Sequence, residues 1–173
     1  MFDSERLNAT HEVEVFDSGN TWLDSWLHTF ARRADSTGIA RTYVWTAPGD
    51  RRVVAYYALC PTEVDRAADG DRAADGVPSS IAGGVSRIPG YLLARLAVSR
   101  DHQGRGLGGQ LLVDALEKTV EASEISGGRA IVVDAIDDAA QEFYRRYGFV
   151  PVRGRPRRLV MKTATAARAV RGG

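Results

Sequence analysis

A glycine-rich loop between a strand-like run and a helix-like run is the feature that most constrains this chain. The stretch RDHQGRGLGG, from Arg100 to Gly109, holds four glycines and two arginines. The run YLLARLAV before it alternates like a strand, and QLLVDALEKTVEA after it repeats apolar residues at helical spacing. Glycines let backbone N–H groups approach a ligand, and a helix that begins there adds unpaired N–H groups and its positive dipole end. The sequence therefore predicts a strand–loop–helix unit that binds phosphate.

Two common phosphate loops fit these glycines poorly. A P-loop continues with Gly-Lys and then Ser or Thr, which this loop lacks. Gly104, Gly106 and Gly109 match the G-x-G-x-x-G spacing of dinucleotide-binding folds, and Asp134 ends the next predicted strand. However, the polar segment SRDHQ separates strand from glycines, where the dinucleotide-binding turn is tight. Few residues also remain after Asp134 to complete a nucleotide-binding sheet, so the pattern favours another phosphate ligand.

Helix and strand patterns alternate along the rest of the chain and predict an α/β fold with a mixed sheet. An early helix, capped by Asn20 or Thr21, is expected to face the core through Trp22, Leu23, Trp26, Leu27 and Phe30. The helix after the glycine loop repeats Leu107, Leu111, Leu112, Ala115, Leu116 and Val120. Strands are expected at residues 40–47, 51–64, 91–99, 129–136, 149–152 and 157–163. A short helix at 138–148 starts at Asp137 or Asp138 and stops at Gly148.

The length fits a single domain, which we place at residues 1–163, with a basic tail at 164–173. The hexapeptide DRAADG occurs twice in residues 65–76, too few copies for a solenoid. We expect residues 65–90 to form a flexible insert. Cys60 lies in an apolar run and is expected to be a buried structural thiol.

Composition indicates an ordinary soluble protein, with 44% hydrophobic and 26% charged residues. No apolar run approaches the roughly 20 residues of a membrane span, and the N-terminus does not resemble a signal peptide. We therefore expect a cytoplasmic protein without a membrane partner.

Charge is distributed unevenly along the chain. From Phe143 to Gly173 there are nine basic residues and no acidic one, although the formal net charge of the chain is only +1. This asymmetry indicates an anionic partner for the basic end. We assign nucleic-acid binding to four arginines near the predicted site, with a solvated basic surface as the alternative: Arg153, Arg155, Arg157 and Arg158.

Two motifs resemble those of the GNAT acetyltransferases. QGRGLG, from Gln103 to Gly108, resembles their [QR]-x-x-G-x-[GA] pyrophosphate loop, and FYRRYGF, from Phe143 to Phe149, resembles their later F-Y-x-x-x-G-F segment. The resemblance implies a central mixed sheet flanked by helices, with acetyl-CoA between its middle strands. It implies that acetyl-CoA is held by a strand segment, Leu96, Ala97 and Val98, and by the loop, Gln103, Gly104, Arg105, Gly106, Leu107, Gly108 and Gly109.

A narrower resemblance covers most of the chain. LDSWL, RTYVW, VVAYYAL, LARLAV, DHQGRGLG and FYRRYGF occur in an order that resembles GNAT toxins of bacterial toxin–antitoxin pairs. It implies N-acetylation of aminoacyl-tRNA, a block of translation, a ribbon-helix-helix antitoxin as partner, and a homodimer. The chain departs from that pattern at Ser18, where many relatives carry Cys, and in the repeat of residues 65–76. The alternatives are a GNAT enzyme for a protein or small-molecule amine, and a non-catalytic acetyl-CoA-binding module.

The expected chemistry needs no nucleophilic side chain, because an amine can attack the thioester directly. His11, His28 and His102 are scattered along the sequence, and we assign no metal or catalytic role to them. The leaving thiolate needs a proton or a hydrogen bond, and the resemblance gives that role to Tyr144, with Tyr147 read as core. A free α-amino group titrates near ~8, and an ester lowers this further, so water can serve as the base.

Overall fold

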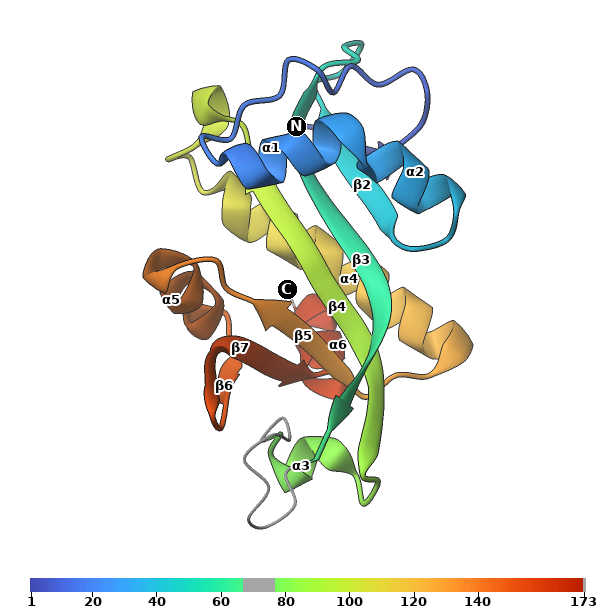
Figure 1. The fold of residues 1–173 in the computed structure, drawn as a ribbon, viewed down its shortest axis with the longest axis vertical. Coiled ribbons are helices and arrows are strands. Elements are labelled where there is room, and N and C mark those ends of the chain that lie inside the picture. Colours follow the sequence, from blue (N-terminus) through green and yellow to red (C-terminus); the bar gives the residue numbers. More distant parts are fainter. Residues whose placement is uncertain (67–76, 173) are drawn as a thin grey trace. The chain divides into compact units, whose positions relative to one another are not determined.

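The computed structural model describes residues 1–66 and 77–172 (Figure 1). Its strands are β1 (Asp3–Arg6), β2 (Arg41–Thr46), β3 (Val53–Asp65), β4 (Arg87–Val98), β5 (Ala130–Asp134), β6 (Val150–Val152) and β7 (Arg155–Lys162). Its helices are α1 (Thr21–Thr29), α2 (Ala31–Ser36), α3 (Ser79–Ala82), the 3₁₀ helix η1 (Arg100–His102), α4 (Leu107–Ser126), α5 (Asp138–Arg146) and α6 (Thr163–Arg171). The predicted alternation of strands and helices is confirmed.

Within the described residues, the strands form one mixed sheet in the order β1-β2-β3-β4-β5-β7-β6. Neighbours β1 and β2, β2 and β3, β5 and β7, and β6 and β7 run antiparallel, while β4 and β5 run parallel. A parallel pair needs a crossover connection, and α4 lies in the chain between β4 and β5. The glycine loop is therefore the first part of that crossover.

The chain groups into two compact units, and the single domain expected over residues 1–163 stays a prediction. The first comprises Met1–Cys60 and Ala94–Ala115, and the second comprises Pro61–Leu93 and Leu116–Gly173. Strands β3 and β4 and helix α4 contribute residues to both units. The glycine loop belongs to the first unit, and Tyr144 with the four predicted tRNA-binding arginines belongs to the second.

The core of the first unit gathers α1, α2 and three strands. Its buried cluster is Leu7, Val13, Phe16, Leu23, Leu27, Ala31, Val44, Val53, Tyr56 and Ala97, with Trp26 packed against it. Asn20 caps α1, as predicted, by accepting from the N–H groups of Trp22 and Leu23. Leu23 and Leu27 share the buried face because they are one turn apart. Trp22, predicted to face the core, is instead 54% exposed.

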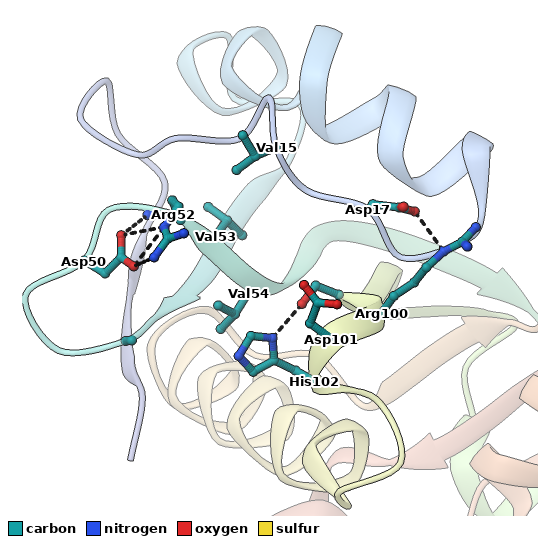
Figure 2. Close-up of a pocket in the computed structure, with 11 residues that line it drawn as sticks. Val15, Asp17, Asp50, Arg52, Val53, Val54, Arg100, Asp101 and His102 are labelled. Atoms are coloured by element: carbon teal, nitrogen blue, oxygen red, sulfur yellow. Dashed lines mark hydrogen bonds and ion pairs between the residues drawn. The ribbon is translucent and has the colours of Figure 1, made fainter.

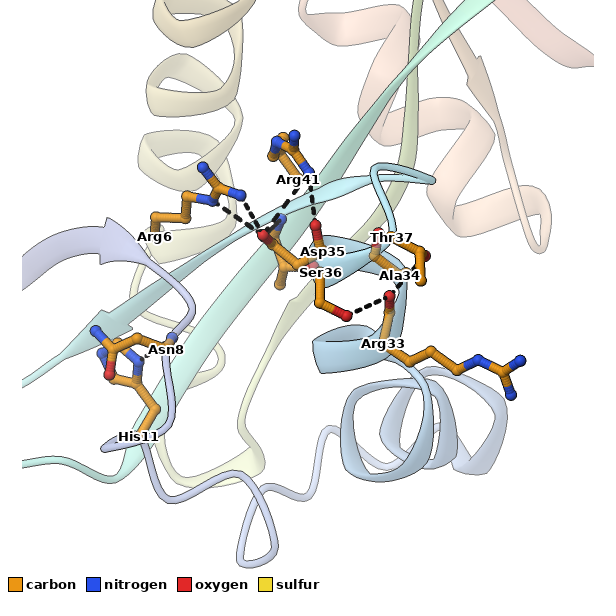
Figure 3. Close-up of polar contacts among 10 residues, drawn as sticks. Arg6, Asn8, His11, Arg33, Ala34, Asp35, Ser36, Thr37 and Arg41 are labelled. Atoms are coloured by element: carbon orange, nitrogen blue, oxygen red, sulfur yellow. Dashed lines mark hydrogen bonds and ion pairs between the residues drawn. The ribbon is translucent and has the colours of Figure 1, made fainter.

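A polar cluster around Asp35 ties α2 to the first two strands (Figure 3). The buried carboxylate of Asp35 accepts from Nε of Arg6 at 3.0 Å and from the backbone N–H of Thr42 at 3.1 Å. Nη1 of Arg41 donates to the Asp35 carbonyl at 2.6 Å. A buried carboxylate needs such donors to replace lost water, so this cluster fixes α2 against β1 and β2.

The core of the second unit lies along β4, β5 and β7. Its buried cluster is Val64, Val77, Ile81, Ala82, Ile88, Ala130, Val132, Val152 and Val160. Gly90 permits the close approach of β4 to β5, because a Cβ there would lie 2.3 Å from the carbonyl oxygen of Ala130. α5 is capped by Asp137, which accepts from the N–H of Ala140 at 2.7 Å, and the chain turns at Gly148 with a φ of 93°, as predicted.

Two terminal segments were not anticipated as regular structure. β1 pairs with β2 through the register Asp3↔Thr46. The expected basic tail at 164–173 is instead largely helix α6, in which Thr163 and Ala166 are buried. These residues are small, so they pack closely without the large apolar side chains that mark a core helix in a sequence.

The predicted insert at residues 65–90 contains regular structure in its described part. Most of its repeat, residues 67–76, lies outside the described residues. The remainder holds the short helix α3, in which Ile81 and Ala82 are buried, and the start of β4. No helix in the described part of the chain is long and apolar enough to cross a membrane.

Candidate acetyl-donor site

The glycine loop has the backbone that its sequence predicts. Gly104 and Gly106 both have a φ of 75°, which residues with a Cβ rarely adopt. A Cβ built at either position would meet no atom within 4 Å. The loop conformation therefore requires glycine at both positions. The space beside them is open to a ligand.

Gln103 anchors the loop. Its Nε2 donates to the carbonyl of Val98 at 2.8 Å and to the carbonyl of Ser18 at 2.8 Å. The loop is also fixed at η1, where Oγ of Ser99 lies 2.8 Å from Nδ1 of His102. Gln103 was predicted to contact the cofactor, and in the structure its amide nitrogen holds the loop against the end of β4.

The start of α4 presents a set of backbone donors. The first four N–H groups of a helix have no acceptor within it, and here these belong to Gly106, Leu107, Gly108 and Gly109. The regular pattern begins when Gln110 N–H donates to the Gly106 carbonyl at 3.5 Å. Together with the helix dipole, these groups form an anion site suited to a diphosphate.

The two arginines of the loop, Arg100 and Arg105, differ in whether they form an ion pair. Nε of Arg100 lies 3.1 Å from a carboxylate oxygen of Asp17, so its charge is partly neutralised. The side chain of Arg105 is exposed, and no ion pair to it is found among the described residues. Arg105 is therefore the better placed of the two for a phosphate.

The β4 segment before the loop offers a strand edge. The β4–β5 register runs from Gly90↔Ala130 to Leu93↔Val133, so Leu96, Ala97 and Val98 lie beyond it. The N–H of Ser99 faces β3, because it donates to Val54 at 2.8 Å. Since strand residues alternate, the N–H groups of Val98 and Leu96 face the other edge. That edge can pair with an extended ligand that carries amides, as the predicted site requires.

A pocket of about 430 Å³ lies beside η1, and sequence reasoning missed it (Figure 2). It is lined by Val53 and Val54 and by charged side chains. Its arginines are paired: Arg52 with Asp50 at 2.7 Å, and Arg100 with Asp17. The hydrogen bond from Arg52 lowers the pKa of the Asp50 carboxyl to about 2. None of the residues from Gln103 to Gly109 lines this pocket, and its three aspartates against two arginines do not favour a polyphosphate.

Tyr144 lies in the second unit, on α5, and is nearly buried at 8% exposure. The rings of Phe143 and Phe149 meet it edge-on at centroid distances of 5.2 and 5.7 Å. Burial raises the pKa of the Tyr144 hydroxyl, which therefore keeps its proton at neutral pH. Tyr147, predicted to be core, is instead 42% exposed, because it follows the last residue of α5.

The predicted tRNA-binding arginines are not equivalent. Arg158 makes a two-point contact with Asp134, at 2.8 and 2.9 Å, and Arg157 pairs with Asp138 at 2.8 Å. Arg153 and Arg155 are exposed. Asp134, which fitted a dinucleotide-binding template in the sequence, is an ion-pair partner of β7 in the structure.

Sequence patterns did not single out Arg95, which directly precedes the predicted donor-binding residues. It stands in the run LLARLAV, and a single charge within an apolar strand is the signal that could have marked it. Cys60, whose thiol interacts electrostatically with Arg95, is half-buried rather than buried, and burial raises its pKa. The thiol is therefore neutral and not an activated nucleophile.

Comparison with known proteins identifies the family. The Acetyltransferase (GNAT) domain matches residues 40–151. A tRNA-acetylating toxin of Mycobacterium tuberculosis is 38% identical over 144 residues, which cover 83% of this chain and 81% of that protein.

Two solved structures resemble nearly the whole chain. AtaT complexed with acetyl-methionyl-tRNAfMet has a TM-score of 0.84 at 28% identity, covering 96% of this chain and 98% of AtaT. A mutant AtaT toxin bound to the C-terminus of the antitoxin AtaR and acetyl-CoA has a TM-score of 0.80 at 27% identity, covering 95% of each chain. Because the family match spans more than half of the sequence and agrees with the fold and the loop, the chain belongs to the GNAT acetyltransferases.

Proposed function

We propose that this chain is a toxin that transfers the acetyl group of acetyl-CoA to the α-amino group of aminoacyl-tRNA and so blocks translation. The observation that carries the proposal is the glycine loop, in which Gly104 and Gly106 hold positive φ angles in front of open space at the start of α4. The similarity to a tRNA-acetylating toxin supports the choice of acceptor.

The donor site follows from the backbone. The N–H groups of Gly106, Leu107, Gly108 and Gly109 bind the pyrophosphate of acetyl-CoA, and Arg105 adds a charge-assisted contact. The free edge at Leu96, Ala97 and Val98 pairs with the amides of the pantetheine arm. Gln103 keeps the loop in the conformation that presents these donors.

The transfer itself makes a C–N bond and breaks the thioester C–S bond. The neutral amine attacks the carbonyl carbon, the amine loses a proton to water, and the thiolate leaves. Tyr144 donates a hydrogen bond to the leaving sulfur. Because burial raises its pKa above the usual value of about 10, this phenol is a poor source of a fully transferred proton but a constant donor of a hydrogen bond. The thiolate then takes its proton from water.

The proposed acceptor and partners are supported by the charge of the C-terminal segment and by similarity to known proteins. Arg153, which is exposed and for which no ion pair is found among the described residues, is suited to a phosphate contact. Arg155, Arg157 and Arg158 contribute once their present contacts open. We also propose a ribbon-helix-helix antitoxin as the inhibitor, a homodimer as the working form, and the cytoplasm as the location. The AtaT structures with AtaR and with acetyl-methionyl-tRNAfMet support the antitoxin and the tRNA.

The test is a comparison of acceptors. The protein is incubated with labelled acetyl-CoA and, separately, with charged tRNA, deacylated tRNA, free amino acids and bulk protein. We expect label only on charged tRNA. Label on protein or on free amines alone would contradict the proposal in favour of a different GNAT acceptor. Tight acetyl-CoA binding without transfer to any acceptor would show a non-catalytic binding module.

A further inference from the structure

Arg95 of β4 and Trp22 of α1 form a stacked pair in the first unit. The guanidinium carbon of Arg95 lies 3.8 Å from the ring centroid of Trp22 and 5.1 Å from that of Trp26. Trp26 in turn stacks on Tyr56 at 6.0 Å with an interplanar angle of 8°. Tyr56 is fixed because its hydroxyl donates to the Leu23 carbonyl at 2.8 Å. The pair therefore rests on a rigid aromatic base.

The guanidinium is incompletely satisfied. Its Nη1 donates to the carbonyl of Ala94 at 2.8 Å, and its Nε is buried without a hydrogen-bond partner among the described residues. Burial also lowers the pKa of Arg95. A buried donor without an acceptor is costly, and arginines in such surroundings are usually paired with a carboxylate. The remaining guanidinium nitrogen, Nη2, is not among these buried atoms, and no acceptor for it is found among the described residues, so it can donate to a ligand.

The pair stands where the acceptor substrate must arrive. With the pyrophosphate at residues 103–109, the pantetheine arm runs back along β4 from Val98 toward Leu96. The acetyl group is then at the end of the arm farthest from the loop, next in sequence to Arg95. An amine that attacks this group has to approach the same part of β4.

Trp22 provides an exposed ring at this place. It is 54% exposed, although it carries a large apolar surface. Single-stranded RNA is bound by stacking its bases on aromatic side chains and on arginine planes, while arginine N–H groups bind its phosphates. A free amino acid or a lysine side chain offers neither a base nor a phosphate.

We propose that Trp22 and Arg95 form a platform for the unpaired 3′ end of aminoacyl-tRNA, in which Trp22 stacks on the terminal nucleobase and Arg95 donates to the adjacent phosphate. This inference rests on the proposed function and specifies the part of the tRNA that the donor site recognises. Trp22 and Arg95 are positioning residues, since they hold the acceptor and take no part in proton transfer.

The first test replaces the ring. Trp22→Leu should lower kcat/KM for charged tRNA on the order of ten- to a hundredfold, mainly through KM, since stacking of one base is lost. Trp22→Phe should recover part of the loss because it keeps an aromatic face. The affinity for acetyl-CoA should be unchanged in both variants, which also shows that they are folded. Ile39→Ala removes another exposed apolar side chain of the same unit and should have no effect.

The second test replaces the arginine. Arg95→Gln should weaken binding of the single-stranded trinucleotide CCA and of charged tRNA, and should flatten the salt dependence of tRNA binding by about one phosphate contact. Arg95→Lys should keep the salt dependence but not the full affinity, because lysine lacks the planar guanidinium that stacks on Trp22.

The outcomes separate the two proposals. If wild type acetylates charged tRNA and both Trp22→Leu and Arg95→Gln do so with unchanged kcat/KM, the platform is wrong and the proposed function stands. If wild type acetylates no charged tRNA, the proposed function fails and the platform fails with it.

Discussion

The glycine loop and the C-terminal basic segment are two candidate phosphate-binding regions that are built in opposite ways. In the loop the donors are backbone N–H groups, oriented by the positive φ angles of Gly104 and Gly106. In the segment from Arg153 to Arg158 the donors are side chains. Arg157 pairs with Asp138 and Arg158 with Asp134, so the charges of these side chains are partly neutralised.

The difference shows that the formal charge of a stretch does not measure the charge it can offer. Residues 143–173 contain nine basic and no acidic side chains, yet carboxylates from outside this stretch neutralise part of the charge. A third pair joins Arg171 to Glu124. A backbone site has no such competitor and depends only on the loop conformation. We therefore expect the two regions to respond very differently to substitution.

The largest effect should come from breaking the loop. Gly106→Val puts a β-branched residue at a φ of 75° and fills the space in front of the N–H groups. We expect acetyl-CoA binding to fall below detection by calorimetry. Gly38→Val is the matched control, because Gly38 has a φ of 78° and equally open surroundings in the same unit. If both variants bind acetyl-CoA equally, the loop does not hold the pyrophosphate.

A smaller but still large effect should come from the leaving-group hydrogen bond. Tyr144→Phe should leave acetyl-CoA affinity unchanged and lower kcat by about 10²–10³-fold, the usual cost of removing one hydrogen-bond donor to a developing negative charge. Tyr147→Phe, at the exposed neighbouring tyrosine, should be nearly neutral. If Tyr147→Phe lowered kcat more than Tyr144→Phe, the hydrogen-bond donor would be Tyr147, and the assignment to Tyr144 would be wrong.

The raised pKa of the Tyr144 hydroxyl leads to a prediction for the pH dependence of kcat. Because burial raises the pKa of Tyr144 above the ordinary value of about 10, the phenol remains protonated throughout the range from pH 7 to 10. The profile of kcat should therefore show no alkaline fall within that range. A fall that disappears in Tyr144→Phe would mean that the hydroxyl titrates there, and would contradict the assignment.

The smallest effects should come from single arginines of the basic segment, and they should differ. Arg153→Gln removes an exposed charge for which no ion pair is found among the described residues, whereas Arg157→Gln removes one that is paired with Asp138. We expect Arg153→Gln to flatten the salt dependence of tRNA binding by about one contact, and Arg157→Gln by less. Acetyl-CoA affinity should stay constant in both. Equal slopes would mean that the ion pair opens when tRNA binds.

Much of the architecture could be predicted because it depends on local patterns. The strand, loop and helix around Gly106, the turn between β2 and β3, and the cap at Asp137 are each specified by residues within a few positions of one another. The loop also carries a short motif, and its glycines Gly104 and Gly106 adopt positive φ angles that other residues rarely adopt.

The parts that could not be predicted depend on contacts between distant residues. The stack of Arg95 on Trp22 joins a strand to a helix that lies far from it in the sequence. The pairing of Arg158 with Asp134 depends on the register between β5 and β7. α6 packs through small residues such as Ala166 that carry little hydrophobic signal. Composition alone cannot reveal which charges meet or which aromatic side chain stays exposed.

The most direct measurement of the central claim is the chemical state of the terminal nucleotide of the acceptor. Charged tRNA is incubated with the protein and acetyl-CoA, digested with ribonuclease, and the released aminoacyl-adenosine is analysed by mass spectrometry. The account predicts an aminoacyl-adenosine heavier by one acetyl group, with fragmentation that places the acetyl on the α-amino nitrogen, and no such product with Tyr144→Phe at early times. An unmodified aminoacyl-adenosine, from reactions in which the same protein acetylates another amine, would contradict it.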